Sequence, residues 1–144
     1  MTDKAPITND PATWPKGDRI WDICRAIAKA EGYNVAGSNP FKLNNPGDIS
    51  DGWKTFGGEP HSGSNITKFP NAETGWLWLY QKIENVLKGK STVFDKGMTW
   101  YEFGKHYCPP NWQIWADNVA ASLHISPDTT VEDYVNTPGS EGEG

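Results

Sequence analysis

The sequence has few of the residues that most directly reveal a chemistry. Among its 144 residues are two cysteines, Cys24 and Cys108, which are too few for a disulfide framework and lack the paired spacing of a zinc site. The three histidines, His61, His106 and His124, lie far apart and lack the helical spacing of a ligand pair. We therefore expect no metal and no other cofactor.

Basic clusters and long apolar segments are also missing. The chain has 13 Lys and Arg against 18 Asp and Glu, a formal net charge of -5, and no cluster that would form a basic face. This composition predicts no nucleic-acid partner. No stretch approaches the length of a membrane span, and the N-terminus lacks the basic run and apolar core of a signal peptide. We expect synthesis in the cytoplasm without a signal peptide.

The composition is instead rich in tryptophan and glycine, with eight and 15 residues. Tryptophan suits a groove that stacks flat neutral surfaces such as sugar rings, although it is as often part of a core. The length corresponds to one domain. We predict a flexible arm over residues 1–14, a single domain over 15–135, a disordered tail over 136–144, and a monomer.

The spacing of apolar residues predicts a first helix that begins near residue 17 and ends at Ala30 or Glu31. Ile20, Cys24, Ile27 and Glu31 fall on one stripe of such a helix. The following Gly32 is a typical helix stop. The stripe therefore places a carboxyl group where an apolar side chain is expected.

The next segment, residues 33–70, is rich in turn formers. Alternation over 53–56 (WKTF) and 65–69 (NITKF) predicts two short strands, and hence a small hairpin or sheet after the first helix. Helical patterns then return, opened by capping residues at Asn71, Thr99, Asn111 and Thr130. The predicted class is α+β and predominantly helical.

Glu31 has three features that suit a general acid. A position on the inward stripe removes water from the carboxyl group, and the negative end of the helix dipole lies beside it, so both effects raise its pKa. The glycine and the irregular loop that follow would open this face onto a cleft. A carboxyl group kept protonated beside a groove can donate a proton to a leaving group. The alternative is a solvated residue at a frayed helix end.

Four segments in this order resemble a phage-encoded lysozyme-like family within the lysozyme and lytic transglycosylase superfamily. They are AIAKAEGY…GSNPFKLNNPGDIS, ITKFPNAETGWLWL, YCPPNW and LHISPDT, and they span about 21–130. The most specific parts are the helix-terminal Glu and the NNPGDI segment that follows it. The resemblance implies a lysozyme-like fold and assigns the catalytic acid to Glu31.

Within that resemblance, three residues of the NNPGDI segment are candidate substrate-binding residues. Asn44 and Asn45 would place amides in the groove, where they could bond sugar hydroxyl or N-acetyl groups; alternatively they hold the loop through backbone contacts. Asp48 follows the Pro-Gly turn.

Aromatic residues and one further carboxylate complete the candidate site. Tyr33 and Trp53 could stack on sugar. Tyr107 resembles a tyrosine that lines the cleft opposite the acid in such enzymes, and a core position is the alternative. Glu73 opens a predicted helix, where it would complement the dipole, or it would face the cleft as a second carboxylate.

The reaction implied by the resemblance is cleavage of peptidoglycan at the β-1,4 bond between N-acetylmuramic acid and N-acetylglucosamine. A lysozyme hydrolyses this bond, with an endolysin role in host lysis; a lytic transglycosylase instead forms 1,6-anhydro ends. A non-catalytic glycan-binding or virion structural module is the further alternative. We expect the chain to act on the periplasmic wall after release from the host cytoplasm.

Overall fold

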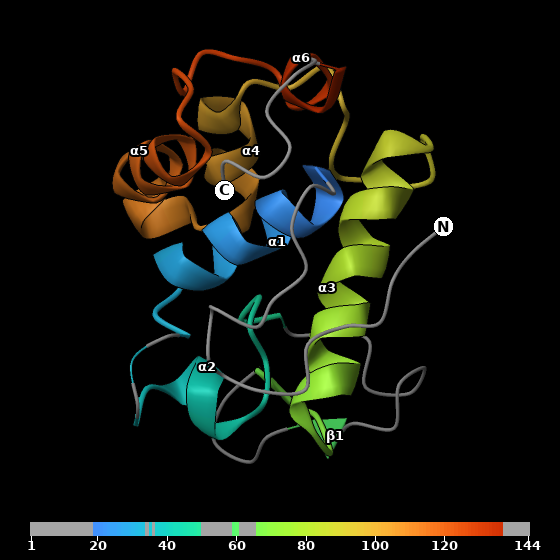
Figure 1. Cartoon of the computed structure of the whole chain (residues 1–144), viewed down its shortest axis with the longest axis vertical. Helices are drawn as coiled ribbons and strands as arrows, with labels where there is room; N and C mark the ends of the chain where they lie inside the picture. Colours follow the sequence, from blue (N-terminus) through green and yellow to red (C-terminus); the bar gives the residue numbers. More distant parts are fainter. Residues whose placement is uncertain (1–18, 34, 36, 50–58, 61–65, 137–144) are drawn as a thin grey trace. The chain divides into compact units, whose positions relative to one another are not determined.

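A computed structural model describes residues 19–33, 35, 37–49, 59–60 and 66–136, with the backbone alone for 59–60 (Figure 1). Most of these residues are helical, which confirms the prediction of a predominantly helical chain. The elements in chain order are α1 (Arg19–Ala30), α2 (Asn39–Lys42), β1 (Glu59–Pro60), β2 (Thr67–Lys68), α3 (Ala72–Leu87), α4 (Trp100–Tyr107), the 3-10 turn η2 (Pro109–Asn111), α5 (Trp112–Leu123) and α6 (Val131–Asn136).

The β structure among the described residues consists of two very short strands. β1 and β2 are two residues long and pair antiparallel, with Glu59 opposite Lys68 and Pro60 opposite Thr67. β2 falls within the predicted strand over 65–69. The other predicted strand, over 53–56, and the connection over 61–65 lie outside the described residues. The described chain therefore does not show the predicted hairpin or sheet, and it does not by itself show a lysozyme-like fold.

The chain divides into two compact units, and the division falls within α1 and α3. The first unit includes Ile27–Gln81, and the second comprises Lys16–Ala26 and Lys82–Gly144. The core of the first unit contains apolar residues from the end of α1 to the first half of α3: Ile27, Tyr33, Leu43, Ile49, Phe69, Trp76 and Leu79. The predicted acid, Glu31, belongs to the same unit.

The second unit has an aromatic core between α4 and α5. The rings of Phe103 and Trp115 stack with centroids 6.0 Å apart, and Tyr107 stacks on Trp115 at 4.9 Å. Gly104 lets the two helices approach, because an added Cβ there would lie 2.9 Å from the Trp112 carbonyl oxygen. The small residue thus explains the close packing of α4 against α5 (Figure 1).

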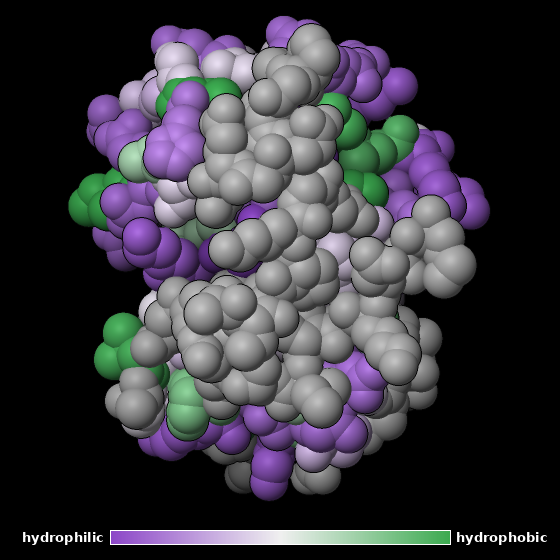
Figure 2. Space-filling view, viewed as in Figure 1, coloured by the Kyte–Doolittle hydropathy of each residue, from purple (hydrophilic) through white to green (hydrophobic). Residues whose placement is uncertain are grey.

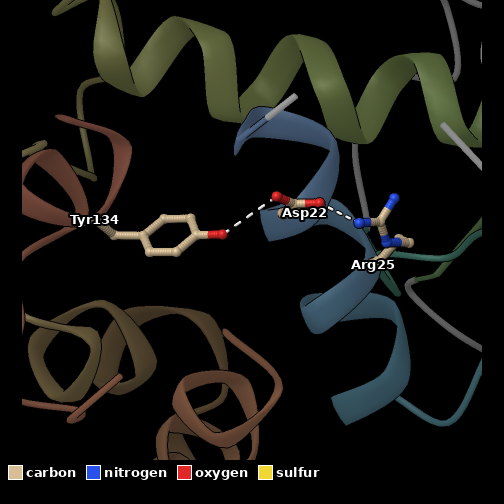
Figure 3. Close-up of polar contacts among 3 residues, drawn as sticks. All are labelled: Asp22, Arg25 and Tyr134. Carbon is tan, nitrogen blue, oxygen red and sulfur yellow. Dashed lines mark hydrogen bonds and ion pairs between the residues drawn. The ribbon is translucent and has the colours of Figure 1, made fainter. Parts of the chain in front are cut away.

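A buried polar contact ties α6 to α1 within the second unit. Figure 3 shows the Asp22 carboxylate between Tyr134 of α6 and Arg25, one turn further along α1. The Tyr134 hydroxyl donates to Asp22 at 3.4 Å, and Arg25 forms an ion pair with the same carboxylate. The Arg19 guanidinium lies 4.7 Å from the centre of the Tyr134 ring. The hydrogen bond and the contact of Arg19 with the Tyr134 ring therefore join α6 to α1, while the ion pair lies within α1.

The predicted capping residues differ in what their side chains do. Thr99 and Glu102 form the predicted capping box at the start of α4. Thr130 accepts from the Asp133 amide at 3.0 Å, and Asn71 accepts from the Thr74 amide at 2.9 Å. Asn111 precedes α5 but makes no side-chain cap, so that prediction is wrong in detail. The preceding η2 turn supplies the entry into α5 instead.

Hydrophilic residues make up most of the coloured surface on the face shown in Figure 2. The large hydrophobic side chains that are exposed among the described residues are Val35, Val93 and Ile114, which are distant from one another in the sequence. Isolated apolar side chains of this kind are ordinary on a folded surface. No helix in the described part of the chain is long and apolar enough to cross a membrane.

Candidate active site

Glu31 occupies the C-terminal cap of α1, as the sequence predicts. The Tyr33 amide donates to the Ala28 carbonyl at 2.9 Å, and the Gly32 amide donates to Lys29 at 3.1 Å. This pattern is a Schellman motif, and Gly32 supplies its left-handed residue with φ of 83°. Glu31 is half-buried and still bonded to the helix, its amide donating to Ile27 at 2.9 Å. The backbone at Glu31 is therefore held by the helix cap, which excludes the alternative of a frayed helix end.

The NNPGDI segment forms a tight loop that is held from inside by Asn45. The Asn45 side chain is fully buried, and its amide nitrogen donates to the carbonyl oxygens of Ile49 at 2.7 Å and Thr67 at 2.8 Å. Its oxygen accepts from the Ile49 amide at 3.0 Å. Three hydrogen bonds from one side chain thus close the loop and join it to β2.

Asn44 holds the same loop from its other side. Its side-chain nitrogen donates to the Phe69 carbonyl at 3.1 Å, and its backbone adopts φ of 54°, a conformation that asparagine tolerates. For Asn44 and Asn45 the structure therefore shows the loop-holding contacts that were the alternative to sugar binding. The sugar-binding role is wrong for Asn45, because its donors are used inside the protein.

The loop rests on the first turns of α3 through two glycines. At Gly75 an added Cβ would collide with the Asn44 carbonyl oxygen. At Gly47 an added Cβ would lie 2.9 Å from the Leu79 side chain. The AETGW and NNPGDI motifs therefore contact each other through their backbones. The sequence analysis identified both motifs but not the role of Gly75. A glycine inside a helical pattern was the signal that could have indicated this role.

Gly75→Ala is expected to lower the free energy of unfolding by about 1 to 3 kcal/mol, because the new methyl group overpacks a contact between backbones. This is the net loss that remains after the gain of about 1 kcal/mol that alanine brings within a helix. Urea unfolding followed by circular dichroism measures it. Gly97→Ala is the control, since its nearest neighbour would be the Asp95 carboxylate at 3.2 Å, and it should stay near wild type. Equal stability of the two variants would contradict the packing argument.

The end of α1 and the NNPGDI loop bring the side chains of Glu31 and Asp48 near each other. Burial raises the pKa of Asp48, and a hydrogen bond with Glu31 opposes that rise. Two neighbouring carboxyl groups, one of them with a raised pKa, are often found at sites of proton transfer.

Tyr33 lies in the core rather than on a surface. Its exposed fraction is 0%, and its ring contacts the rings of Trp76 at 5.4 Å and Phe41 at 6.1 Å. Burial also raises the pKa of its hydroxyl. Because a ring without exposed surface cannot stack on a sugar, the prediction for Tyr33 is wrong. Its role is to pack the chain that leaves Glu31 against α3.

The remaining predicted site residues are Tyr107, Glu73 and Trp53. Tyr107 ends α4 in the second unit, where it packs in the aromatic cluster with Phe103 and Trp115. Glu73 lies in the first turn of α3, the position that complements a helix dipole. Trp53 lies outside the described residues. The cleft-lining role of Tyr107 and the role of Trp53 stay predictions.

Two further observations concern metal ions and relatives. Among the described residues, no group of three or more His, Cys, Asp or Glu side chains is placed to hold a metal ion.

Comparison of the chain with protein-family models, curated proteins and solved structures found no match. Proposals about its function therefore rest on its own residues and on the resemblance of its motifs.

Proposed function

We propose that this protein cleaves the glycan strands of peptidoglycan at the β-1,4 bond after N-acetylmuramic acid, with Glu31 as the general acid. The observation that carries the proposal is the position of Glu31, which is half-buried at the capped C-terminal end of α1, next to the NNPGDI loop. Burial and the negative end of the helix dipole both favour the protonated form of a carboxyl group, and protonation of a glycosidic oxygen requires that form. The motif resemblance supplies the substrate class.

The lysozyme-like fold and the biological role are parts of the same proposal. A helix that ends in the acid, a loop closed by Asn45 and a following helix with a glycine at the contact support such a fold. An endolysin-like role in host lysis follows from the phage-encoded family that the motifs resemble. The substrate is then the periplasmic wall, reached after release from the host cytoplasm.

Direct bonding of the two carboxyl groups favours lytic transglycosylation as a second candidate reaction. A retaining hydrolase places its two carboxyl groups about 5 Å apart across the scissile bond, and an inverting one about 6.5 to 9.5 Å apart. Asp48 interacts directly with Glu31, so we infer that it does not face Glu31 across a bound sugar as a nucleophile or as a base for water. A transglycosylase needs only one acid, because the 6-hydroxyl of the substrate attacks.

Digestion of purified sacculi by the wild-type protein, read by mass spectrometry, tests the proposal. Soluble muropeptides are expected, with 1,6-anhydro ends if the sugar hydroxyl attacks and reducing ends if water does. Binding to sacculi without any soluble product would contradict catalysis and would indicate the non-catalytic module. Heat-unfolded protein is the control for release by contaminating enzymes.

A further inference from the structure

The end of α1 is held by the side chain of Ser38, the N-cap residue of α2. The Ser38 hydroxyl donates a hydrogen bond to the Gly32 carbonyl oxygen at 2.8 Å. The same oxygen accepts a second hydrogen bond from the Val35 amide at 3.0 Å. Because Gly32 directly follows Glu31, the hydroxyl of Ser38 bonds the helix cap one residue after the proposed acid.

Ser38 also fixes the start of α2. Its side-chain oxygen accepts from the Phe41 amide at 3.3 Å, which is the contact of an N-cap, and its carbonyl oxygen accepts from the Lys42 amide at 2.9 Å. Its own amide donates to the Val35 carbonyl at 3.1 Å. One half-buried serine therefore joins the end of the helix that carries Glu31 to the start of the next helix.

The helix α2 is bonded in turn to the NNPGDI loop and to the chain beside β2. The Asn45 amide donates to the Pro40 carbonyl at 2.8 Å, and the Phe69 amide donates to the Leu43 carbonyl at 2.9 Å. All of these residues belong to the first unit, and Pro40 and Leu43 are buried. The position of α2 is therefore fixed from the side of the loop, and Ser38 passes this constraint on to the end of α1.

We propose that Ser38 is a positioning residue for Glu31, because its hydrogen bond to Gly32 holds the backbone from which the acid side chain extends in a fixed place beside α2 and the NNPGDI loop. This inference rests on the proposed function. A general acid must lie within hydrogen-bond reach of the oxygen that it protonates, and a displacement of about 1 Å can cost about 100-fold in rate. The role acts through the backbone of Gly32 and assigns no contact between Ser38 and the substrate.

Two substitutions of Ser38 and one control separate this role from the capping of α2. Glycine is tolerated at an N-cap with little loss of helix stability, but it has no hydroxyl to donate to Gly32. Threonine keeps both the donor and the cap acceptor. The matched control is Ser91→Gly, since Ser91 is also half-buried and its hydroxyl oxygen accepts from the Phe94 amide at 3.0 Å, in a turn of the second unit.

The first test measures amide hydrogen exchange in the native protein by NMR, and it needs no enzyme activity. In Ser38→Gly the amides of Tyr33 and Val35, which close the helix cap and bond the Gly32 carbonyl, should exchange about 2- to 10-fold faster than in the wild type, as expected for the net loss of one hydrogen bond. Ser38→Thr and Ser91→Gly should leave both rates near wild type. Unchanged rates in Ser38→Gly would overturn the inference, whether or not the protein cleaves glycans.

The second test compares the kinetics of muropeptide release from purified sacculi. Ser38→Gly should lower kcat by about 10- to 100-fold with little change in KM, because a misplaced acid acts poorly in the transition state. Ser38→Thr should restore kcat to near the wild-type value. Ser91→Gly also removes a hydroxyl that accepts a backbone hydrogen bond, so it should lose some stability but keep the wild-type kcat. A loss of stability alone therefore does not explain a fall in kcat that is confined to Ser38→Gly.

The outcomes distinguish a failed inference from a failed proposal of function. A kcat of Ser38→Gly equal to that of the wild type would overturn the positioning role, as would an equal fall in Ser38→Thr or in Ser91→Gly. Wild-type protein that releases no muropeptides would instead contradict the proposed function, and the exchange rates would then show by themselves whether Ser38 holds the end of α1.

Discussion

Glu31→Gln is expected to reduce the release of muropeptides from purified sacculi by about 10²- to 10⁴-fold, the range that general acid catalysis contributes. The glutamine amide has no proton to transfer to a leaving oxygen. It can still donate a hydrogen bond to Asp48, so the contact between the end of α1 and the NNPGDI loop is kept. The measurement is the rate of muropeptide release by chromatography, together with the melting temperature of the variant.

A matched substitution separates the loss of the acid from a general effect of changing a glutamate. Glu84 lies on α3, where its carboxylate pairs with Lys88 at 3.6 Å, and Glu84→Gln should retain wild-type activity. Glu31→Gln should melt within a few degrees of the wild type, because its packing and hydrogen bonding are kept. Retained lysis by a folded Glu31→Gln variant would show that Glu31 is not the acid.

Asn45→Ala is expected to destabilise the protein by about 3 kcal/mol. The Asn45 side chain is fully buried and makes three hydrogen bonds to backbone groups of Ile49 and Thr67. Its loss removes these partners from buried backbone groups and leaves a cavity in the loop. Urea unfolding followed by tryptophan fluorescence measures the change.

Two further variants show whether hydrogen bonding causes that loss. Asn45→Asp keeps the volume and the acceptor for the Ile49 amide, but it removes both donors and places a carboxylate against two carbonyl oxygens. It should therefore destabilise at least as strongly as alanine at neutral pH. Asn118→Ala, at an exposed position on α5, should stay within about 0.5 kcal/mol of wild type. A small effect of both Asn45 variants would contradict the loop-closing role.

Some predicted site residues could be located from local sequence patterns, whereas the roles of others depended on tertiary contacts. A carboxyl group on an apolar helix stripe, followed by glycine, was enough to locate Glu31, because helix periodicity and the glycine stop are local properties. The roles of Asn44, Asn45 and Tyr33 depend on what lies opposite them. Amides can bond a sugar or a backbone equally well, and a tyrosine can face solvent or a core. Only the contacts with β2, Phe69 and Trp76 decided these cases.

The sequence by itself determined where α1, α3, α4, α5 and α6 lie and how most of them begin and end, whereas the four-residue α2 falls in a segment that was predicted to be irregular. Periodicity, the capping residues Thr99 and Asn71, and the stop at Gly32 act over a few residues, so they can be read without tertiary structure. The predicted strand over 65–69 contains β2, whereas the predicted strand over 53–56 lies outside the described residues.

Only the tertiary structure decided that Glu31 meets Asp48 and that Gly75 gives the loop its place on α3. Positions 31 and 48 belong to different segments, and no local pattern fixes the distance between them. Their meeting depends on a left-handed backbone at Asp48, on a buried amide at Asn45 and on the missing side chain at Gly75. Packing of distant segments against one another, and not the propensity of any one of them, places Glu31 beside Asp48.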